Sequence, residues 1–174
     1  MVFVTHGQDE ALSLADRIAI MRDGRLEQVG PPDTVYRQPH TEFVAGFIGQ
    51  MNLIEGDVHA GRLYAAGLSL PVSLSEGPAT LALRPEDLGL QCASGEAGAK
   101  VMRVTDFGTH LSVELHTADR VKLKATAEPG PGWAAGMHAE LRPRKFAVYR
   151  EGKLCDRPLA QGSGELPASI VDLR

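Results

Sequence analysis

The feature that most constrains the fold of this 174-residue chain is a change in hydrophobic period near Asn52. Before this residue, apolar side chains follow the spacing of short helices, and after it they alternate with polar side chains. Alternation with a period of two is typical of half-buried strands, because successive side chains point to opposite faces of a sheet. Glycine, proline and aspartate interrupt the pattern at short intervals and favour turns. The sequence therefore predicts a mainly β fold, a small barrel or sandwich, preceded by a partly helical segment.

Several segments after residue 52 fit the strand pattern. The expected strands are residues 53–58, 62–72 with a break at Gly67, 80–84, 100–107, 110–116, 120–126, 138–141 and 145–149. In the clearest pair, a short loop at 117–119 predicts Leu115 opposite Val121 and Val113 opposite Leu123. Glu114 would then face Lys122 on the solvent side, which is a favourable cross-strand pair.

The first residues of the chain carry mixed strand, helix and hairpin signals. Residues 2–4 predict a short buried strand, because β-branched and aromatic side chains favour strands. Residues 8–15 predict a helix with acidic side chains in its first turn, where they suit the helix dipole. Residues 18–21 and 26–29 predict a hairpin around the Asp-Gly pair at 23–24, since that pair readily adopts positive φ.

Two further short helices are expected before the strands begin. The first covers residues 32–37, because proline is tolerated in its first turn and Pro39 stops it. The second covers residues 42–48, with Thr41 as the N-cap and Gly49 at its end.

Composition and charge argue against several classes of function. A net charge of −4 and a pI near 5.8 disfavour a surface that binds nucleic acid. No apolar run approaches the roughly 18 residues that a membrane-spanning helix needs. Cys92 and Cys155 lie far apart in the sequence, as expected for reduced cytosolic thiols. No metal site is expected, because metal-ligand spacing is lacking among His59, His110, His116 and His138.

The most informative motif runs from Thr5 to Gly30, where a Thr-His pair precedes a helix and an Asp-Gly hairpin. The order of residues closely resembles the switch-histidine segment of ABC transporter ATPases. The matching positions are Thr5, His6, Gln8, Glu10, Ala11, Leu14, Ala15, Asp16, Arg17, Ile18, Met21, Gly24, Gln28 and Gly30. The resemblance continues at Pro32, Tyr36, Pro39, Phe43, Val44, Ala45, Phe47, Ile48, Gly49, Met51 and Asn52. These later positions resemble the bridge to the accessory domain in importers that serve sugars, polyamines and similar solutes.

The resemblance implies that His6 hydrogen-bonds the γ-phosphate of ATP in the whole ATPase. Gly7 departs from the family, which usually has aspartate there, so the subunit contact of that aspartate is not expected. The chain also lacks the Walker A loop, the Walker B acidic pair and the Ser-Gly-Gly-Gln signature. Phosphoryl transfer depends on groups that position the phosphates and magnesium. We therefore expect no enzyme activity and no cofactor for this chain, whereas the parent protein would use Mg-ATP.

A second motif, Arg84-Pro85-Glu86, follows the strand expected at 80–84. It resembles the Arg-Pro-Glu segment of the transport-associated, oligonucleotide-fold-like accessory domains of these ATPases. Residues 100–108 resemble the strand that follows in the family. The family's segment is partly structural and lies near contacts between paired regulatory domains. We favour a structural role for Arg84 and Glu86, and all three residues are candidates for regulatory or dimer contacts.

The resemblance implies three parts: a remnant of a nucleotide-binding domain at 1–50, an oligonucleotide-fold-like β-barrel at 51–155 and a tail at 156–174. The apolar start at 1–4 leads us to expect a piece of a longer protein. That parent would couple ATP hydrolysis to solute import at the cytoplasmic face of a bacterial inner membrane. The expected partners are a second copy, with strands that pair or exchange at open edges, and the permease subunits. Nucleic acid is not expected as a partner.

Two other functions are open at this point. A sensor of small oxyanion-type ligands would have a cleft lined by backbone amides and by lysine or arginine. A nucleic-acid-binding barrel would have a basic face with stacking aromatic residues, which are scarce in this sequence.

Overall fold

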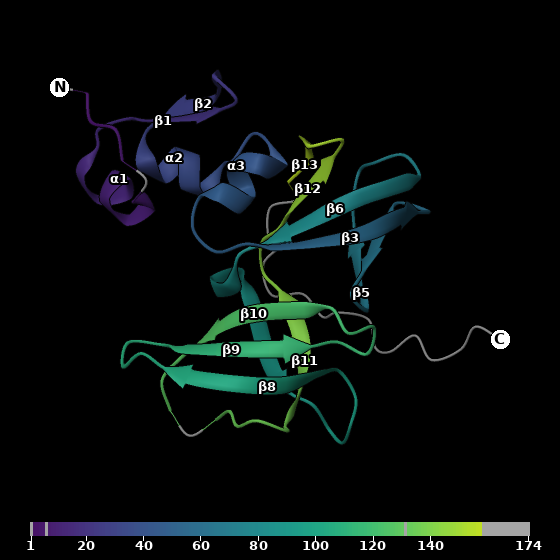
Figure 1. Cartoon of the computed structure of the whole chain (residues 1–174). Coiled ribbons are helices and arrows are strands. Elements are labelled where there is room, and N and C mark those ends of the chain that lie inside the picture. Colours follow the sequence, from purple (N-terminus) through teal and green to yellow (C-terminus); the bar gives the residue numbers. More distant parts are fainter. Residues whose placement is uncertain (1, 6, 131, 158–174) are drawn as a thin grey trace.

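A computed structural model describes residues 2–5, 7–130 and 132–157, which form two antiparallel sheets preceded by short helices and a hairpin (Figure 1). The first elements are α1 (Gln8–Leu14), β1 (Ile18–Arg22), β2 (Arg25–Gly30), α2 (Pro32–Arg37) and α3 (Glu42–Phe47). They confirm the predicted helices and hairpin. Asp23 and Gly24 both have positive φ, at 50° and 74°, as a tight turn between β1 and β2 requires.

The larger sheet has six strands and lies against the helices. Its order is β13 (Lys153–Asp156), β12 (Ala147–Arg150), β6 (Gly77–Leu83), β3 (Asn52–His59), β4 (Arg62–Ala65) and β5 (Leu68–Pro71). Residues 77–83 and 147–150 therefore lie side by side although they are far apart in the sequence. The six-stranded sheet therefore combines strands from early and late parts of the chain.

The second sheet has five strands and lies below both the helices and the six-stranded sheet in the view of Figure 1. Its order is β10 (Lys122–Ala127), β9 (Leu111–His116), β8 (Ala99–Asp106), β11 (His138–Pro143) and β7 (Leu88–Cys92). A short 3₁₀ turn, η1 (Pro85–Asp87), connects β6 to β7. The outer strands β10 and β7 approach each other, so the sheet curls towards a barrel.

The largest apolar cluster joins the inner faces of both sheets. Val58, Leu63 and Leu81 of the larger sheet and Val101 and Val113 of the smaller sheet are fully buried in it. A separate cluster holds the hairpin and helices together around Val35 and Val44. The mainly β fold, with a β-rich accessory unit after a partly helical segment, is confirmed.

The expected strand at residues 2–4 is wrong. Residues 2–5 form no regular element, and Val2, Phe3 and Val4 are 93%, 67% and 86% exposed. A strand is stable only when its backbone groups pair with a neighbour. No strand in the described part of the chain pairs with these residues.

The predicted register of β9 and β10 is also wrong, by two residues. Leu115 lies opposite Leu123 rather than Val121, and Glu114 lies opposite Lys124 rather than Lys122. The turn is longer than expected because Arg120 adopts a φ of 61°. A shift of two residues keeps each side chain on its expected face, since strand side chains alternate with a period of two.

Two strands were not predicted. The Leu88–Cys92 strand follows directly on η1, and its apolar pattern is short. The Lys153–Asp156 strand forms because Glu151 and Gly152 adopt positive φ in a tight hairpin turn with β12. This strand ends at Asp156, the first residue of the expected tail, and residues 158–174 lie outside the described residues.

Candidate functional site

The guanidinium group of Arg84 lies at the junction between the helices and the two sheets. Arg84 directly follows β6 and is only 6% exposed. Its Nη1 donates to the carbonyl oxygens of Ile48 and Gln50, the latter at 3.0 Å. Its Nη2 donates to the carbonyl oxygen of Tyr36 at 2.7 Å. One side chain thus binds the end of α2 and the segment after α3.

Tyr36 and Glu86 complete this contact on the outer side. The Arg84 guanidinium carbon lies 3.9 Å from the centre of the Tyr36 ring, a cation–π arrangement. The Tyr36 hydroxyl donates to Glu86 Oε1 at 2.8 Å. The first and third residues of the Arg-Pro-Glu motif therefore contact α2, while Pro85 is buried between them.

Burial determines the electrostatics of this junction. Burial lowers the pKa of the Arg84 guanidinium, and the nearby Tyr36 and Glu86 oppose this shift. Burial and then the hydrogen bond to Glu86 raise the pKa of the Tyr36 phenol. Burial, followed by repulsion from Glu86, raises the pKa of the Asp87 carboxyl, although Lys145 partly offsets it. The Arg84 cation is stabilised by carbonyl dipoles and an aromatic face rather than by a buried ion pair.

Gly49 lets the backbone approach Arg84 and Tyr36 closely. Its φ is 67°, and a Cβ atom there would lie 2.7 Å from Tyr36 Cε2 and 3.0 Å from Arg84 Nη1. The Gly49 amide donates to Gln8 Oε1 at 2.9 Å. Gln8 thereby fastens the first turn of α1 to the same junction.

The β12–β13 hairpin forms a second fastening. The hydroxyl of fully buried Tyr149 donates to the carbonyl oxygen of Pro39 at 2.9 Å. The Glu42 amide donates to the Gly152 carbonyl at 2.9 Å, and the Leu154 amide donates to the His40 carbonyl at 3.2 Å. The segment between α2 and α3 is thus held by the last described strands.

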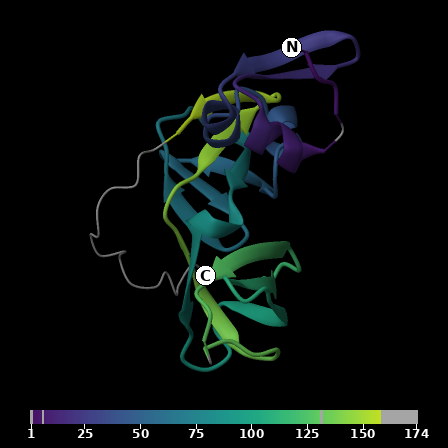
Figure 2. The same ribbon diagram turned by 90° about the vertical axis from the view of Figure 1, so that its left-hand side faces the viewer.

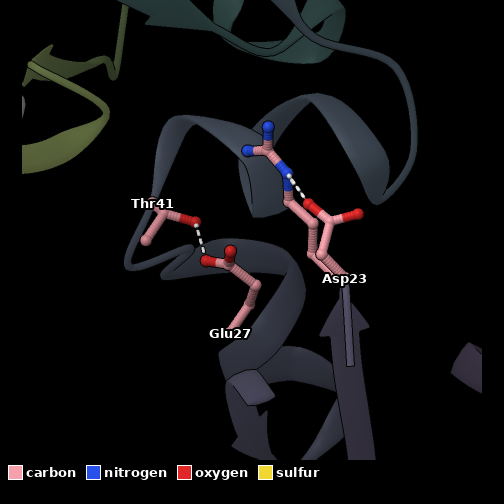
Figure 3. Close-up of polar contacts among 4 residues, drawn as sticks. Asp23, Glu27 and Thr41 are labelled. Carbon is pink, nitrogen blue, oxygen red and sulfur yellow. Dashed lines mark hydrogen bonds and ion pairs between the residues drawn. The ribbon is translucent and has the colours of Figure 1, made fainter. Parts of the chain in front are cut away.

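A third set of contacts connects the β1–β2 hairpin to the same segment. Gln28 is 4% exposed, and its side chain donates to the Gln38 carbonyl at 2.9 Å and accepts from the His40 amide at 2.8 Å. The Thr41 hydroxyl donates to Glu27 Oε2 at 3.1 Å (Figure 3). It also accepts from the Val44 amide at 3.2 Å. The predicted N-cap of α3 is confirmed, and the same hydroxyl also connects α3 to β2.

An open cleft of about 310 Å³ lies beside this junction. Met51, Ala147 and Pro39 contribute apolar surface to it, and Lys145 and Arg37 contribute charge. The hydrogen-bonded nitrogens of Arg84 donate to backbone carbonyls, so this residue holds segments of the chain together.

The described residues contain neither a cluster of metal ligands nor a membrane-spanning helix. Among residues 2–5, 7–130 and 132–157, no group of three or more histidine, cysteine, aspartate or glutamate side chains is placed to hold a metal ion. No helix in this described part of the chain is long and apolar enough to cross a membrane.

The predicted site residues lie in different settings in the structure. His6 lies outside the described residues. Arg84 and Pro85 are buried within the chain, whereas Glu86 is exposed, and their role as dimer contacts stays a prediction. Tyr36 and Gln8 were matched to the family pattern without a role being assigned. An aromatic residue and an amide in matched positions were the available signal, but their partners lie 48 and 41 residues away.

Comparisons with known proteins agree with this arrangement of a helical segment and a β-rich unit. The family model of the TOBE domain matches residues 81–148, from the end of β6 to β12. The chain therefore carries a TOBE domain.

Relatives extend the similarity beyond the TOBE domain. The sulfate/thiosulfate import ATP-binding protein CysA of Caulobacter vibrioides is 44% identical over 151 residues, which cover 85% of this chain and 43% of the relative. The protein of the same name from Xylella fastidiosa is 40% identical over 154 residues, covering 85% and 44%. The Fe(3+) ions import ATP-binding protein FbpC 1 of Rhizobium meliloti is 37% identical over 126 residues, covering 67% and 36%.

The chain spans less than half the length of these curated relatives. It is similar to ATP-binding subunits of importers, as the resemblance to ABC transporter ATPases implies. The expected sugar and polyamine subfamily is not confirmed, because these relatives are named for sulfate, thiosulfate and Fe(3+) import.

Proposed function

We propose that this chain is the C-terminal regulatory and dimerisation part of the ATP-hydrolysing subunit of an ABC importer. The observation that carries this proposal is the Arg84 junction, which fastens the sheets of the TOBE domain to the segment that resembles the end of a nucleotide-binding domain. The similarity to import ATP-binding proteins supports it. In the parent, ATP hydrolysis would drive the import of a solute.

The proposed role follows from how many contacts converge on residues 36–50. α1, the β1–β2 hairpin, Arg84 and the β12–β13 hairpin of the six-stranded sheet all bind this segment through side-chain or backbone hydrogen bonds. In the parent, His6 would contact the γ-phosphate of ATP only two residues before Gln8. A displacement of α1 on hydrolysis would reach Gly49 through Gln8 and then Arg84.

The proposed division of the chain is the one expected from the sequence, with a nucleotide-binding remnant at 1–50, a regulatory β domain at 51–155 and a tail at 156–174. The names of the relatives support sulfate or thiosulfate as the solute of the parent. The parent would use Mg-ATP and would act with permease subunits at the cytoplasmic face of the membrane.

A second copy is the proposed partner for the open edges and apolar residues. Phe3 and Leu14 are 67% and 81% exposed, and β5 is an edge strand of the six-stranded sheet. Exposed edges and apolar side chains favour association, because pairing satisfies backbone groups and removes apolar area from water. A homodimer is therefore expected, with exchange of strands as one route to it.

Titration calorimetry with Mg-ATP tests the proposal. The 174-residue chain is expected to give no binding heat and no phosphate release, because it lacks the nucleotide-cradling motifs. The complete Caulobacter vibrioides relative serves as the positive control. Saturable binding or turnover by the chain itself would contradict the proposed regulatory role, and sedimentation of the same sample reports whether it is a dimer.

A further inference from the structure

Asn52 joins the two sheets through its side chain. It is the first residue of β3 in the six-stranded sheet and is 7% exposed. Its Nδ2 donates to the carbonyl oxygen of Lys124 at 2.8 Å, and its Oδ1 accepts from the Lys124 amide at 2.7 Å. Lys124 lies on β10, the edge strand of the five-stranded sheet. The side-chain amide thus pairs with β10 as a neighbouring strand would.

The chemistry of this contact requires asparagine. The second Nδ2 hydrogen goes to the Leu83 carbonyl at 3.0 Å, so the nitrogen meets two acceptors and the oxygen meets one donor. A carboxylate would place negative charge against both carbonyl oxygens, and an aliphatic side chain would leave the Leu83 carbonyl and both Lys124 backbone groups without this partner. Only an amide of this length satisfies all three groups at once.

The position of Asn52 in the chain gives this contact its significance. Ile48 and Gln50, whose carbonyls accept hydrogen bonds from Arg84, lie four and two residues before it. The sheets are otherwise joined by two chain crossings, at η1 and between β11 and β12, and by the shared apolar core. Apolar packing is non-directional, whereas hydrogen bonds fix orientation.

We propose that Asn52 is a positioning residue that sets the orientation of the five-stranded sheet against the six-stranded sheet. Through it, a displacement of residues 48–51 is carried to β10, while Arg84 carries the same displacement to η1. This role goes beyond the proposed function, because it holds whatever nucleotide or solute the parent binds. It identifies Asn52 as the residue whose substitution should release the five-stranded sheet from the six-stranded sheet without disturbing the strands of the smaller sheet.

The two native cysteines provide a direct test. Cys92 lies on β7 of the smaller sheet and Cys155 on β13 of the larger sheet, and both are exposed free thiols. Nitroxide labels on both thiols report the distance between the sheets by pulsed electron resonance, measured in dilute mixtures with unlabelled chain. We expect one narrow distance distribution in the native chain. Asn52→Asp should shift or broaden it at neutral pH while the far-ultraviolet circular dichroism of the strands is kept.

Tyr149→Phe is the matched control. It also removes one buried hydrogen bond to a carbonyl, that of Pro39, but this bond does not connect the two sheets. Its thermal midpoint should fall while its distance distribution stays native. Acidification of Asn52→Asp should narrow the distribution again, because the protonated carboxyl group can donate to a carbonyl oxygen.

Amide exchange of the native chain gives a measurement that does not depend on a variant folding. On a strand, the amides of alternate residues point the same way, so those of Lys122, Lys124 and Thr126 all face away from β9. The Lys124 amide should exchange at least about tenfold more slowly than those of Lys122 and Thr126, because only it meets Asn52. Equal exchange at the three positions, or a native distance distribution in Asn52→Asp, would overturn the proposal.

Discussion

Gly49 shows how single atoms shape the junction. Two separate effects disfavour a side chain there: the positive φ, and the 2.7 Å approach of a Cβ atom to Tyr36. Gly67 has a similar φ of 76° but nothing within 4 Å of the Cβ position, so it reports the backbone effect alone. Comparison of the two positions isolates the packing against Tyr36 and Arg84.

We expect Gly67→Ala to lower the free energy of unfolding by about 1 kcal/mol, as an L-residue in the left-handed region does. Gly49→Ala should cost about 3 kcal/mol, because the added methyl group must displace the Tyr36 ring as well. Urea unfolding of both variants measures the difference. Equal losses would mean that the ring yields without cost and that the junction is loosely packed.

Asp87 supplies a pH-dependent prediction. Its pKa is raised in the folded chain, first by burial and then by Glu86, so the fold favours the protonated carboxyl group. The protonated carboxyl group contributes to the free energy of unfolding, and this contribution is fully present below the unfolded pKa of about 3.9. It is lost as the pH rises through the higher pKa of the folded chain. Asp87→Asn removes this loss.

The Asp87→Asn variant should therefore match the native chain near pH 3 and exceed it in stability by a growing margin as pH rises above 4. The margin should become constant once the native carboxyl group is fully ionised. Urea midpoints at unit intervals from pH 3 to pH 7 provide the test. A margin that is largest at pH 3 would show that the carboxylate, not the acid, is favoured by the fold.

At the scale of elements, Thr41 connects a helix to a hairpin with one hydroxyl group. That hydroxyl caps α3 through the Val44 amide. It also donates to Glu27 on β2 (Figure 3). Thr41→Ala should lower the free energy of unfolding by about 1 kcal/mol or slightly more, as the loss of an N-cap does. Thr41→Ser keeps the hydroxyl and should retain most of that stability in urea unfolding. Similar losses in both variants would assign the effect to the methyl group and its packing.

Elements fixed by local chemistry were predictable from the sequence. The hairpin at Asp23-Gly24 and the cap at Thr41 depend on residues within four positions of each other. The register of β9 and β10 was not predictable, because Arg120 adopts positive φ where neither glycine nor asparagine signals it. Similarly, the extra strand at 153–156 depends on a left-handed Glu151.

The site was only partly predictable for a different reason. The Arg84-Pro85-Glu86 motif is visible in the sequence, but its partners lie 34 to 50 residues away and are mostly backbone carbonyls. Every residue has a carbonyl group, so no side-chain pattern identifies these acceptors. The bond from Asn52 to Lys124 spans 72 residues and was hidden in the same way.

At the scale of the whole molecule, the helices and the six-stranded sheet lie together at one end and the five-stranded sheet lies at the other (Figure 2). The six-stranded sheet contacts both neighbours and is the element through which they are connected. Residues from both halves of the chain build it, since β12 and β13 return to join β6. We therefore expect the helices and the sheets to unfold together.

Arg84 connects the helices to the sheets, and calorimetry of Arg84→Gln tests this connection. The native chain should melt in one transition whose calorimetric and van't Hoff enthalpies agree. Arg84→Gln leaves carbonyls of Tyr36, Ile48 and Gln50 without their donor, so the segment before residue 50 should melt earlier, in a separate transition. Exposed Arg142→Gln is the control and should melt as the native chain does. A single, unsplit transition in Arg84→Gln at the native midpoint would contradict the claim that Arg84 unites the helices with the TOBE domain.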